Sequence, residues 1–250
     1  PVAAGCFAVA GPVQDQHVKV TNLPWEFNAQ ELAQDCGIPR VRLLNDFEAV
    51  GYGIPVLHDT DLTALQRGTP ASSGLACVIG AGTGLGQATL RIRDNDVEVW
   101  PGEGGHIDFA PRNHTEFALA QYWSDKLDRV SNETFLSGPG IVRIFEFLQH
   151  ESGKDTSSSL HKAMQAGDPS AAISRFALEQ HDPVAQGTME LFTEIYGAVA
   201  GNFALAVKAT AGVYIAGGIA PRIIELLTQP RFLAAFTGKA PMTALLKSIP

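Results

Sequence analysis

Residues 75–93 read LACVIGAGTGLGQATLRIR: an apolar run, a glycine-rich segment and an alternating run in succession. Leu75 to Ile79 is continuously apolar, which is typical of a buried strand. Gln87 to Arg93 alternates apolar and polar side chains, which predicts a second, half-buried strand. The glycine-rich residues 80–86 between them predict a tight turn that reverses the chain.

The glycine turn does not match the common nucleotide-binding patterns. A GxGxxG fingerprint counted from Gly80 needs glycine at Leu85, and a strand rather than a helix follows, while no GxxxxGK occurs. Backbone N–H groups of such a turn can still converge on a phosphate, and Thr83 adds a hydroxyl. Taken alone, the turn favours a plain hairpin, because glycines are common in hairpin turns.

The residues before this stretch predict a small α/β unit. Asn28 is a suitable N-cap and Gly37 a suitable stop for one helix. The expected elements are an apolar strand at Ala3–Ala10 buried on both faces, a short strand at His17–Val20, a helix at Asn28–Cys36, a strand at Val41–Leu44 and a helix from Phe47 to about Gly53.

After the stretch, one more strand is expected at Val97–Trp100, and then the pattern becomes helical. Helices are expected at Glu116–Leu127, Gly140–His150, Ser157–Ala166, Ala171–Glu179 and Val184–Ala209, followed by a strand at Val213–Ala216, a helix after Pro221 and the start of a strand at Leu245–Pro250. This order predicts two α/β lobes, a partial small lobe at 1–56 and a large lobe with a helical portion at 57–250.

Asn45 and Asp46 follow directly after the predicted strand at Val41–Leu44. Residues at the ends of strands in α/β folds line ligand crevices, so Asp46 could accept a proton from a bound hydroxyl. Either residue would equally serve as the N-cap of the next helix. The local sequence alone favours the capping role.

Two further segments place polar side chains among glycines. Glu103 and His106 lie in PGEGGHID, residues 101–108, where glycines let the backbone approach a ligand. No second His or Cys stands near His106, so a metal site is not expected. Glu133 precedes the helix that starts near Gly140. Gly217-Gly218 follows the expected strand at Val213–Ala216, where the backbone could lie close to a nucleotide base or could only be the turn that enters a helix.

Composition excludes several classes of protein. The chain has 250 residues and a net charge of −8, with no cluster of Lys and Arg, so nucleic acid is not an expected partner. No apolar run approaches the roughly 20 residues of a membrane span. Cys6, Cys36 and Cys77 are odd in number and far apart, which predicts neither a disulfide framework nor a zinc site but reduced thiols in the cytoplasm.

In this order along the chain, five motifs resemble the bacterial glucokinase family, within the actin, sugar-kinase and heat-shock ATPase superfamily. They are Asn45-Asp46, the turn at residues 80–86, the segment 101–106, Glu133 with residues 136–140, and residues 215–218. The resemblance covers nearly the whole chain. It implies an α/β, two-lobed actin-like ATPase (ribonuclease H-like) fold, of the zinc-free type because the chain lacks a cysteine cluster.

The resemblance also implies a reaction: ATP-dependent phosphorylation of glucose at the C6 hydroxyl. Asp46 matches the general base, and Asn45, Glu103, His106 and Glu133 match sugar-binding positions. Gly82-Thr83-Gly84 matches a phosphate loop and Gly217-Gly218 an adenosine loop. The partners implied are glucose, ATP with Mg²⁺, and a second copy of the chain in a homodimer.

One family motif does not occur in the sequence. The family begins with an Asp-x-Gly-Gly-Thr phosphate loop whose Asp helps to hold Mg²⁺, and no such run is found in residues 1–250. We therefore expect a chain truncated at both ends, with an incomplete small lobe and the Mg²⁺-linked Asp in the missing amino-terminal segment. Such a chain is expected to bind glucose weakly and to be poorly active alone.

Two other functions fit the same fold. A catalytically silent sugar sensor would need the pocket but not the base, so the presence of Asp46 argues against it. No helix-turn-helix pattern is evident, so a sensor of the usual kind, a DNA-binding repressor, is not expected. A heat-shock-type or phosphatase-like ATPase would leave Glu103, His106 and Glu133 without a role.

Overall fold

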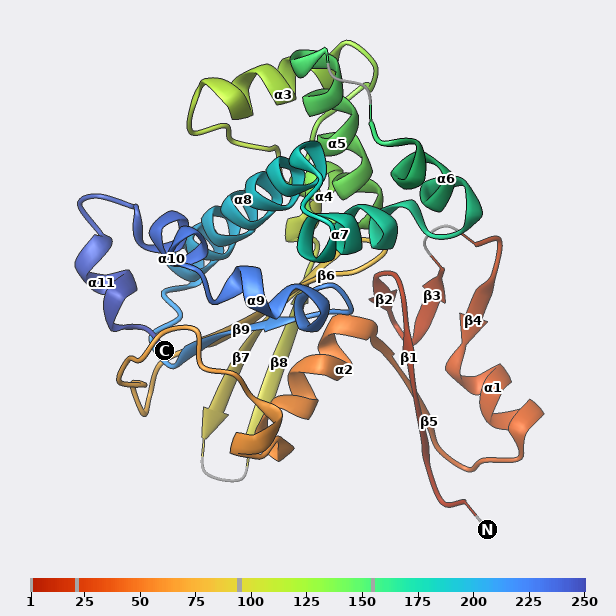
Figure 1. The fold of residues 1–250 in the computed structure, drawn as a ribbon. Helices are drawn as coiled ribbons and strands as arrows, with labels where there is room; N and C mark the ends of the chain where they lie inside the picture. Colours follow the sequence, from red (N-terminus) through yellow and green to blue (C-terminus); the bar gives the residue numbers. More distant parts are fainter. Residues whose placement is uncertain (1, 21–22, 94–95, 154–155) are drawn as a thin grey trace.

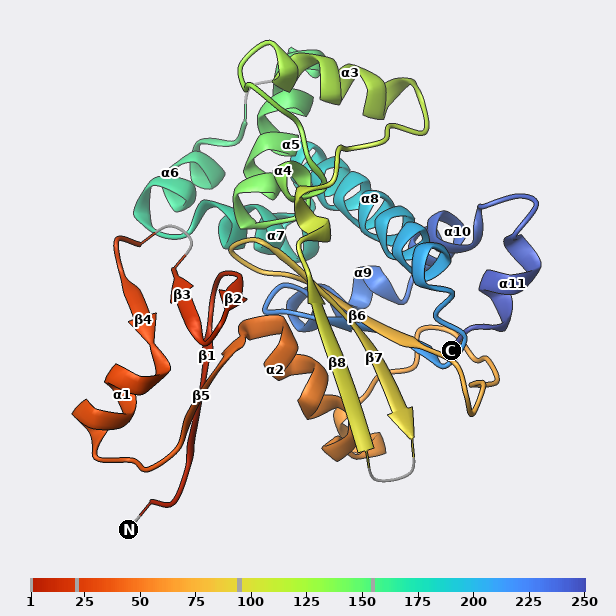
Figure 2. The ribbon, with the colours of Figure 1, turned by 180° about the vertical axis from the view of Figure 1, so that it is seen from behind.

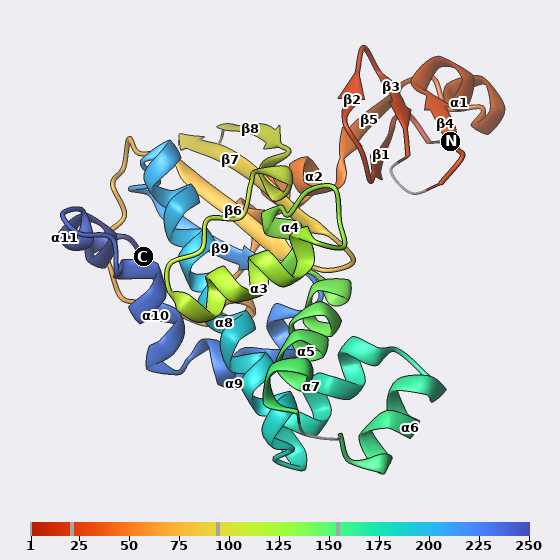
Figure 3. The same cartoon turned by 90° about the horizontal axis from the view of Figure 1, so that it is seen from above.

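A computed structural model describes residues 2–20, 23–93, 96–153 and 156–250. Two lobes are visible in Figure 1, joined through strand β5 (Val41–Asn45) and helix α2 (Asp46–Gly53). Seen from above, the smaller lobe stands to one side of the helical one (Figure 3). Among the described residues no helix, including the 25-residue α8 (Pro183–Val207), has the composition needed to cross a bilayer.

The large lobe is organised around a four-stranded sheet in the order β8-β7-β6-β9. Strands β6 (Ala76–Ala81) and β7 (Leu85–Arg93) form the predicted antiparallel hairpin, and β8 (Asp96–Gly102) extends it. Strand β9 (Gly212–Ala216) returns parallel to β6. The strand predictions for this lobe are confirmed, with boundaries shifted by a few residues.

Helices cover both faces of this sheet (Figures 1 and 2). On one face the buried side chains of Phe192, Ile195 and Tyr196 bring α8 against β6. The other face carries α2. Further elements of the lobe are η1 (Ile54–Val56), η2 (Asp59–Asp61), η3 (Gly104–His106), α3 (His114–Ser124), α4 (Asn132–Phe135), α5 (Gly138–Ser152), α6 (Ser158–Ala166), α7 (Pro169–Glu179), η4 (Ala220–Ile223), α9 (Ile224–Leu227), α10 (Pro230–Thr237) and α11 (Thr243–Ser248).

The small lobe holds two short sheets and one helix. Strand β1 (Gly5–Val9) pairs parallel with β5, and β2 (Val13–Gln14), β3 (His17–Lys19) and β4 (Glu26–Asn28) form an antiparallel sheet. Helix α1 (Ala29–Cys36) begins and ends as predicted. The Asn28 side chain accepts a hydrogen bond of 2.8 Å from Gln30 N, and Gly37 has a φ of 63°, in the left-handed region that favours glycine.

Two sequence predictions are wrong in detail. Strand β1 is not buried on both faces: Cys6 and Ala8 are exposed, and among the described residues β5 is its only sheet partner. The segment 245–250 is not a strand, because α11 occupies most of it. The Gln66 side chain bonds two of its carbonyl groups, since Nε2 donates to Leu246 O at 2.8 Å and to Ile249 O at 2.6 Å, and Val213 N of β9 donates to Pro250 O at 2.9 Å.

Tyr196 joins strands β6 and β9 at the end where the glycine turn begins. Its hydroxyl accepts a hydrogen bond of 3.1 Å from Ala81 N and lies 3.3 Å from Ala216 O, and the residue is fully buried. Burial raises the pKa of this phenol, so it stays protonated and can act as donor and acceptor together.

We expect Tyr196→Phe to lower the free energy of unfolding by about 1–3 kcal/mol, because the N–H of Ala81 would be left buried without an acceptor. Urea denaturation measures the change. Tyr214→Phe is the matched control: its half-buried hydroxyl has no hydrogen bond within the described residues, so the change should stay within about 0.5 kcal/mol. Equal effects of the two substitutions would contradict this role of Tyr196.

Candidate active site

Asn45 and Asp46 begin helix α2, and their environments differ. Asn45 is the N-cap: its Oδ1 accepts from Phe47 N at 2.9 Å and Glu48 N at 3.2 Å, while its Nδ2 donates to Gly11 O at 3.1 Å. The capping role is therefore confirmed for Asn45, which keeps one amide N–H for a ligand. Asp46 is exposed, and within the described residues its carboxylate accepts only from Phe47 N.

The Phe47 ring fixes this helix start against the glycine hairpin. Gly80 and Gly86 face each other across β6 and β7, and the ring lies where their side chains would be. A methyl group on Gly80 would lie 2.6 Å from Phe47 Cζ, and one on Gly86 would overlap the ring more severely. Asp46 is consequently held at a fixed place relative to the turn that follows β6.

The turn at residues 82–84 has the properties of a phosphate cradle. Its shape is fixed by Gly82 N donating to Gly84 O and by Gly138 N donating to Gly82 O, each at 2.8 Å. The second bond brings the start of α5 beside the turn. The N–H groups of Thr83 and Gly84 have no acceptor within the described part of the chain, and Thr83 is exposed. Unpaired main-chain donors in such a turn suit an anion.

Glu133 adjoins the far side of the same turn. Its Oε2 accepts a hydrogen bond of 2.8 Å from Leu85 N, which leaves Oε1 available to a ligand. A methyl group on Gly84 would lie only 2.5 Å from Oε2, so the glycine leaves the room that this carboxylate occupies. A sugar-binding candidate and a phosphate-binding candidate are thus in direct contact.

Glu103 directly precedes η3 and His106 is its last residue, next to α4. The Glu103 carboxylate and the His106 ring lie 3.8 Å apart, and both side chains are more than half exposed, at 57% and 52%. Asn132 joins their turn to α4, because its N donates to Ile107 O at 2.9 Å and its Nδ2 to Gly104 O at 3.4 Å. The turn that carries Glu103 and His106 therefore lies beside the residue that precedes Glu133. That the three side chains surround one sugar stays a prediction.

Gly217 and Gly218 lie at the end of β9, next to the start of the turn. Gly217 has a φ of 83°, and a methyl group on it would lie 2.9 Å from Ala81 N. Only glycine suits both constraints. Ile219 N donates to Ala81 O at 3.2 Å, so the predicted adenosine loop and the predicted phosphate loop leave the sheet side by side.

Some residues that build this site were not predicted from the sequence. Phe47, Asn132 and Gln87 each contact a predicted site segment, but no local motif marks them. No sequence signal marked Gln87, because the face of β7 that it shares with Leu85 also carries Thr89 and Arg91. The other two are an aromatic and an amide in ordinary helical positions.

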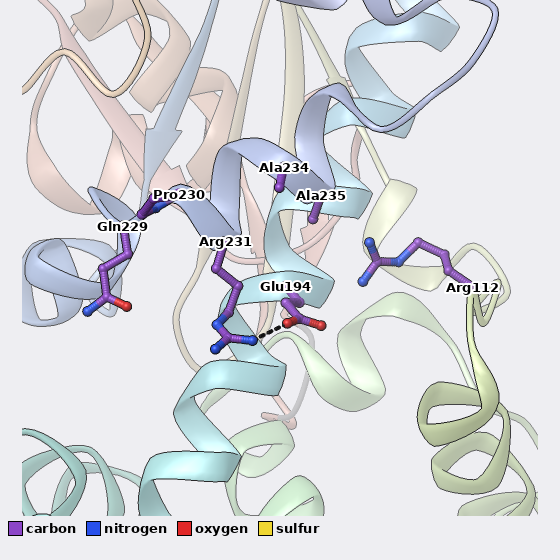
Figure 4. Close-up of a pocket in the computed structure, with 7 residues that line it drawn as sticks. All are labelled: Arg112, Glu194, Gln229, Pro230, Arg231, Ala234 and Ala235. Carbon is purple, nitrogen blue, oxygen red and sulfur yellow. Dashed lines mark hydrogen bonds and ion pairs between the residues drawn. The ribbon is translucent and has the colours of Figure 1, made fainter.

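A cavity of about 610 Å³ lies elsewhere, between α8, α10 and the loop before α3 (Figure 4). Arg231 there pairs with Glu194 and, at 3.2 Å, with Glu190, and Arg112 pairs with the buried Glu116. These pairs neutralise both guanidinium groups, and no predicted site residue lines the cavity. Among the described residues no group of His, Cys, Asp or Glu side chains could hold a metal ion.

The whole chain is similar to known proteins. The family model described as glucokinase matches residues 1–250. The glucokinase of Nostoc punctiforme is 46% identical over 258 residues, a match that covers 98% of this chain and 76% of the relative.

The chain belongs to the glucokinase family. A crystal structure of a glucokinase from an Antarctic psychrotroph is 31% identical, with a TM-score of 0.82 over 98% of this chain and 73% of that one. The glucokinase of Balamuthia mandrillaris, solved in complex with glucose, has 23% identity and a TM-score of 0.81 over 98% and 71%. The two-lobed actin-like ATPase fold of the family is therefore confirmed, and the chain spans about three quarters of these relatives.

Contact between Phe47 and the facing glycines predicts a non-additive pair of substitutions. Gly86→Ala should lower the free energy of unfolding by about 1–3 kcal/mol, because the added methyl group overlaps the ring. In a Phe47→Ala background the same change should cost far less, since the ring is gone. Urea denaturation of the four proteins of this cycle measures the difference.

Gly53→Ala is the control for the glycine substitution. Gly53 ends the same helix and has no neighbouring atom within 4 Å of an added methyl group. This change should be neutral or slightly stabilising. Additive effects of Gly86→Ala and Phe47→Ala would show that the ring does not occupy the space between the two glycines.

Proposed function

We propose that this chain transfers the terminal phosphoryl group of ATP to the C6 hydroxyl of glucose, with Asp46 as the general base. The observation that carries the proposal is the placement of an exposed carboxylate, through Phe47, against a hairpin whose turn presents unpaired N–H groups. A base and an anion cradle are the two parts that phosphoryl transfer to an alcohol requires. A catalytically silent sensor would not need this alignment.

Sugar binding is assigned to Glu103, His106, Glu133 and the remaining N–H of Asn45. Each sugar hydroxyl is both donor and acceptor, so carboxylates, an imidazole and an amide are suitable partners. The exposed Glu103 and His106 side chains and the free Oε1 of Glu133 leave this capacity available. A site built to pair hydroxyls disfavours analogues that lack one of them.

Nucleotide binding is assigned to Gly82-Thr83-Gly84 for the phosphates and to Gly217-Gly218 for the adenosine. The open backbone at both segments supports this, since no atom lies within 4 Å of a methyl group added at Gly82 or Gly218. Mg²⁺ would accompany ATP and neutralise the charge of the phosphates. No described residue is assigned to the metal.

In the reaction, each residue has a limited task. Asp46 accepts the proton of the C6 hydroxyl as that oxygen bonds to the terminal phosphorus of ATP, and the bond from that phosphorus to the oxygen of the leaving ADP breaks. The sugar-binding residues hold the hydroxyl in line with the phosphate, and the turn at 82–84 stabilises the charge on the transferring group. The chain's own contribution is therefore positioning and electrostatic stabilisation.

Family resemblance also leads us to propose a homodimer and a cytoplasmic location. Cys6, Cys36 and Cys77 are free thiols, in keeping with a reducing compartment. Ile107 and Phe117 are each 62% exposed, and large exposed apolar side chains suit a contact between copies. Sedimentation equilibrium measures the oligomeric state.

Asp46→Asn should lower kcat by about 10²–10⁴-fold while glucose affinity is retained, because the substitution removes the base but keeps the shape. A coupled assay gives kcat and calorimetry gives the glucose affinity. Asp35→Asn is the control, an exposed aspartate on α1 without a described interaction, and should leave both unchanged. An unaltered kcat in Asp46→Asn would overturn the assignment of the base.

Gly82→Val tests the phosphate cradle better than a change at Gly84, which would also displace Glu133. No described atom lies within 4 Å of a methyl group added at Gly82, so the fold should tolerate a side chain there. It would occupy the space above the turn and raise the KM for ATP by about tenfold or more, the loss of one charge-assisted hydrogen bond, without weakening glucose binding.

Gly167→Val is the matched control, at another glycine with open space around it and far along the chain. It should change neither constant. If Gly82→Val left the KM for ATP at the parent value, the turn would be a structural hairpin only.

A further inference from the structure

The turn at residues 82–84 lies next to a carboxylate. The N–H groups of Thr83 and Gly84 have no acceptor within the described part of the chain, but the next N–H, that of Leu85, donates to Glu133 Oε2 at 2.8 Å. Successive Cα atoms are about 3.8 Å apart, so a phosphate held by the first two N–H groups would lie within about 8 Å of this negative charge. The turn therefore offers donors to an anion while a carboxylate already occupies the donor that follows.

Bonds on both sides hold this carboxylate in place. Glu133 lies in the four-residue helix α4, and a methyl group on Gly84 would lie 2.5 Å from its Oε2. Ser137 Oγ donates to Glu133 O at 2.9 Å, and the next residue, Gly138, donates from its N to Gly82 O at 2.8 Å. Glu133 and the turn thus form one hydrogen-bonded unit, which the carboxylate cannot leave without breaking its bond to strand β7.

A second carboxylate lies near the same turn. A methyl group on Gly138 would lie 3.4 Å from Ser170 Oγ, which donates to Asp168 Oδ1 at 2.8 Å. This hydrogen bond, together with main-chain N–H groups and the positive charge of Arg222, holds the pKa of Asp168 below its ordinary value, so the group is ionised at neutral pH. Two negative charges therefore lie around a turn whose free donors suit an anion.

No cation is bonded to this arrangement. Within the described residues, no Lys or Arg side chain forms a hydrogen bond or an ion pair with the turn or with Glu133. Arg143 donates to Thr134 O, at 3.1 Å, instead. Because the repulsion between a carboxylate and a ligand grows with the charge of the ligand, it is strongest for a nucleotide without a metal ion. A bound divalent cation lowers the negative charge of the nucleotide, and the repulsion falls with it.

We propose that Glu133 is a specificity-determining residue of the turn at 82–84: its carboxylate disfavours phosphate anions that carry no metal ion and so selects nucleotides whose charge a divalent cation has lowered. The free N–H groups attract both forms, and the carboxylate supplies the difference between them. This task is separate from the sugar contact assigned to the same side chain. It rests on the proposed assignment of the turn to the phosphates of ATP.

Glu133→Gln is the decisive variant, because it removes the charge and keeps an acceptor oxygen for Leu85 N. We expect the Kd for ATP in EDTA to fall about tenfold and the Kd for ATP with Mg²⁺ to fall clearly less, so that the preference for the metal-bound form shrinks. Calorimetry without sugar gives both constants, since no hydroxyl is then present to accept the phosphoryl group. A side chain that only held the turn in shape would give the opposite result, weaker binding of ATP.

Asp182→Asn is the matched control. Asp182 Oδ1 accepts from Val184 N and Ala185 N at 3.1 Å each, so this substitution also removes one carboxylate that is bonded to main-chain N–H groups. Helix α7, about 16 Å long, separates it from Ser170 near the turn. Both Kd values should therefore stay at the level of the parent, because salt screens charges at such a distance.

Asp168→Asn is an independent second variant, in which the amide oxygen still caps α7. The Kd for metal-free ATP should fall as in Glu133→Gln, but by a smaller factor, because Ser170 and Gly138 lie between Asp168 and the turn. An unchanged or higher Kd would contradict the electrostatic explanation even if Glu133→Gln did not fold.

Failure of this inference can be told from failure of the proposed function. If the parent chain does not bind ATP with Mg²⁺, the assignment of the turn to the nucleotide is itself contradicted. If the parent binds ATP, and Glu133→Gln leaves the Kd for metal-free ATP unchanged or raises it, Glu133 does not select by charge. If the substitution lowers both Kd values by the same factor, the carboxylate weakens phosphate binding without discriminating, and the proposal is wrong as well.

Discussion

Two glycines that face each other across β6 and β7 allow a phenyl ring to pack directly against the face of the sheet. Gly80 and Gly86 leave a space that Phe47 fills, and the residue before Phe47 is Asp46. Because proteins are packed as densely as organic crystals, a ring in such a space is held to within a fraction of an ångström. The geometry of the base relative to the phosphate turn therefore depends on the absence of two side chains.

One residue, Ala81, contacts several other elements of the large lobe through its main chain. Its N–H bonds to the Tyr196 hydroxyl, its carbonyl accepts from Ile219, and Gly217 packs against it. The long helix, the late strand and the hairpin thus meet where the turn begins. A site built on strand ends and fixed by buried hydrogen bonds is more precisely placed than one built on loops.

The charged side chains have two roles: some form ion pairs between helices, and others are available to a ligand at the proposed site. Arg112 with Glu116, and Arg231 with Glu194, form ion pairs of the helical layer that leave little charge for a ligand. The carboxylates at the proposed site are not consumed in this way. Glu103 faces only a histidine, and Asp46 accepts only from a main-chain N–H within the described residues. Groups that remain unpaired in the empty protein are those that a substrate can engage.

Most of the strands and helices follow from the sequence, since apolar periodicity, Asn28 as a cap and the glycine turn are local signals. The sequence by itself also determined the family, because five separated motifs stand in one order. Tertiary structure alone decided which partners these residues meet. Asn45 proved to be a cap, residues 245–248 became helical against the core, and Gln87 came to lie beneath Gly104. Contacts such as those of Asn45 Nδ2 with Gly11 O, of Gln66 with Leu246 O and of Gln87 with Gly104 join residues far apart in the chain, where no local pattern records which backbone or side chain will be the partner.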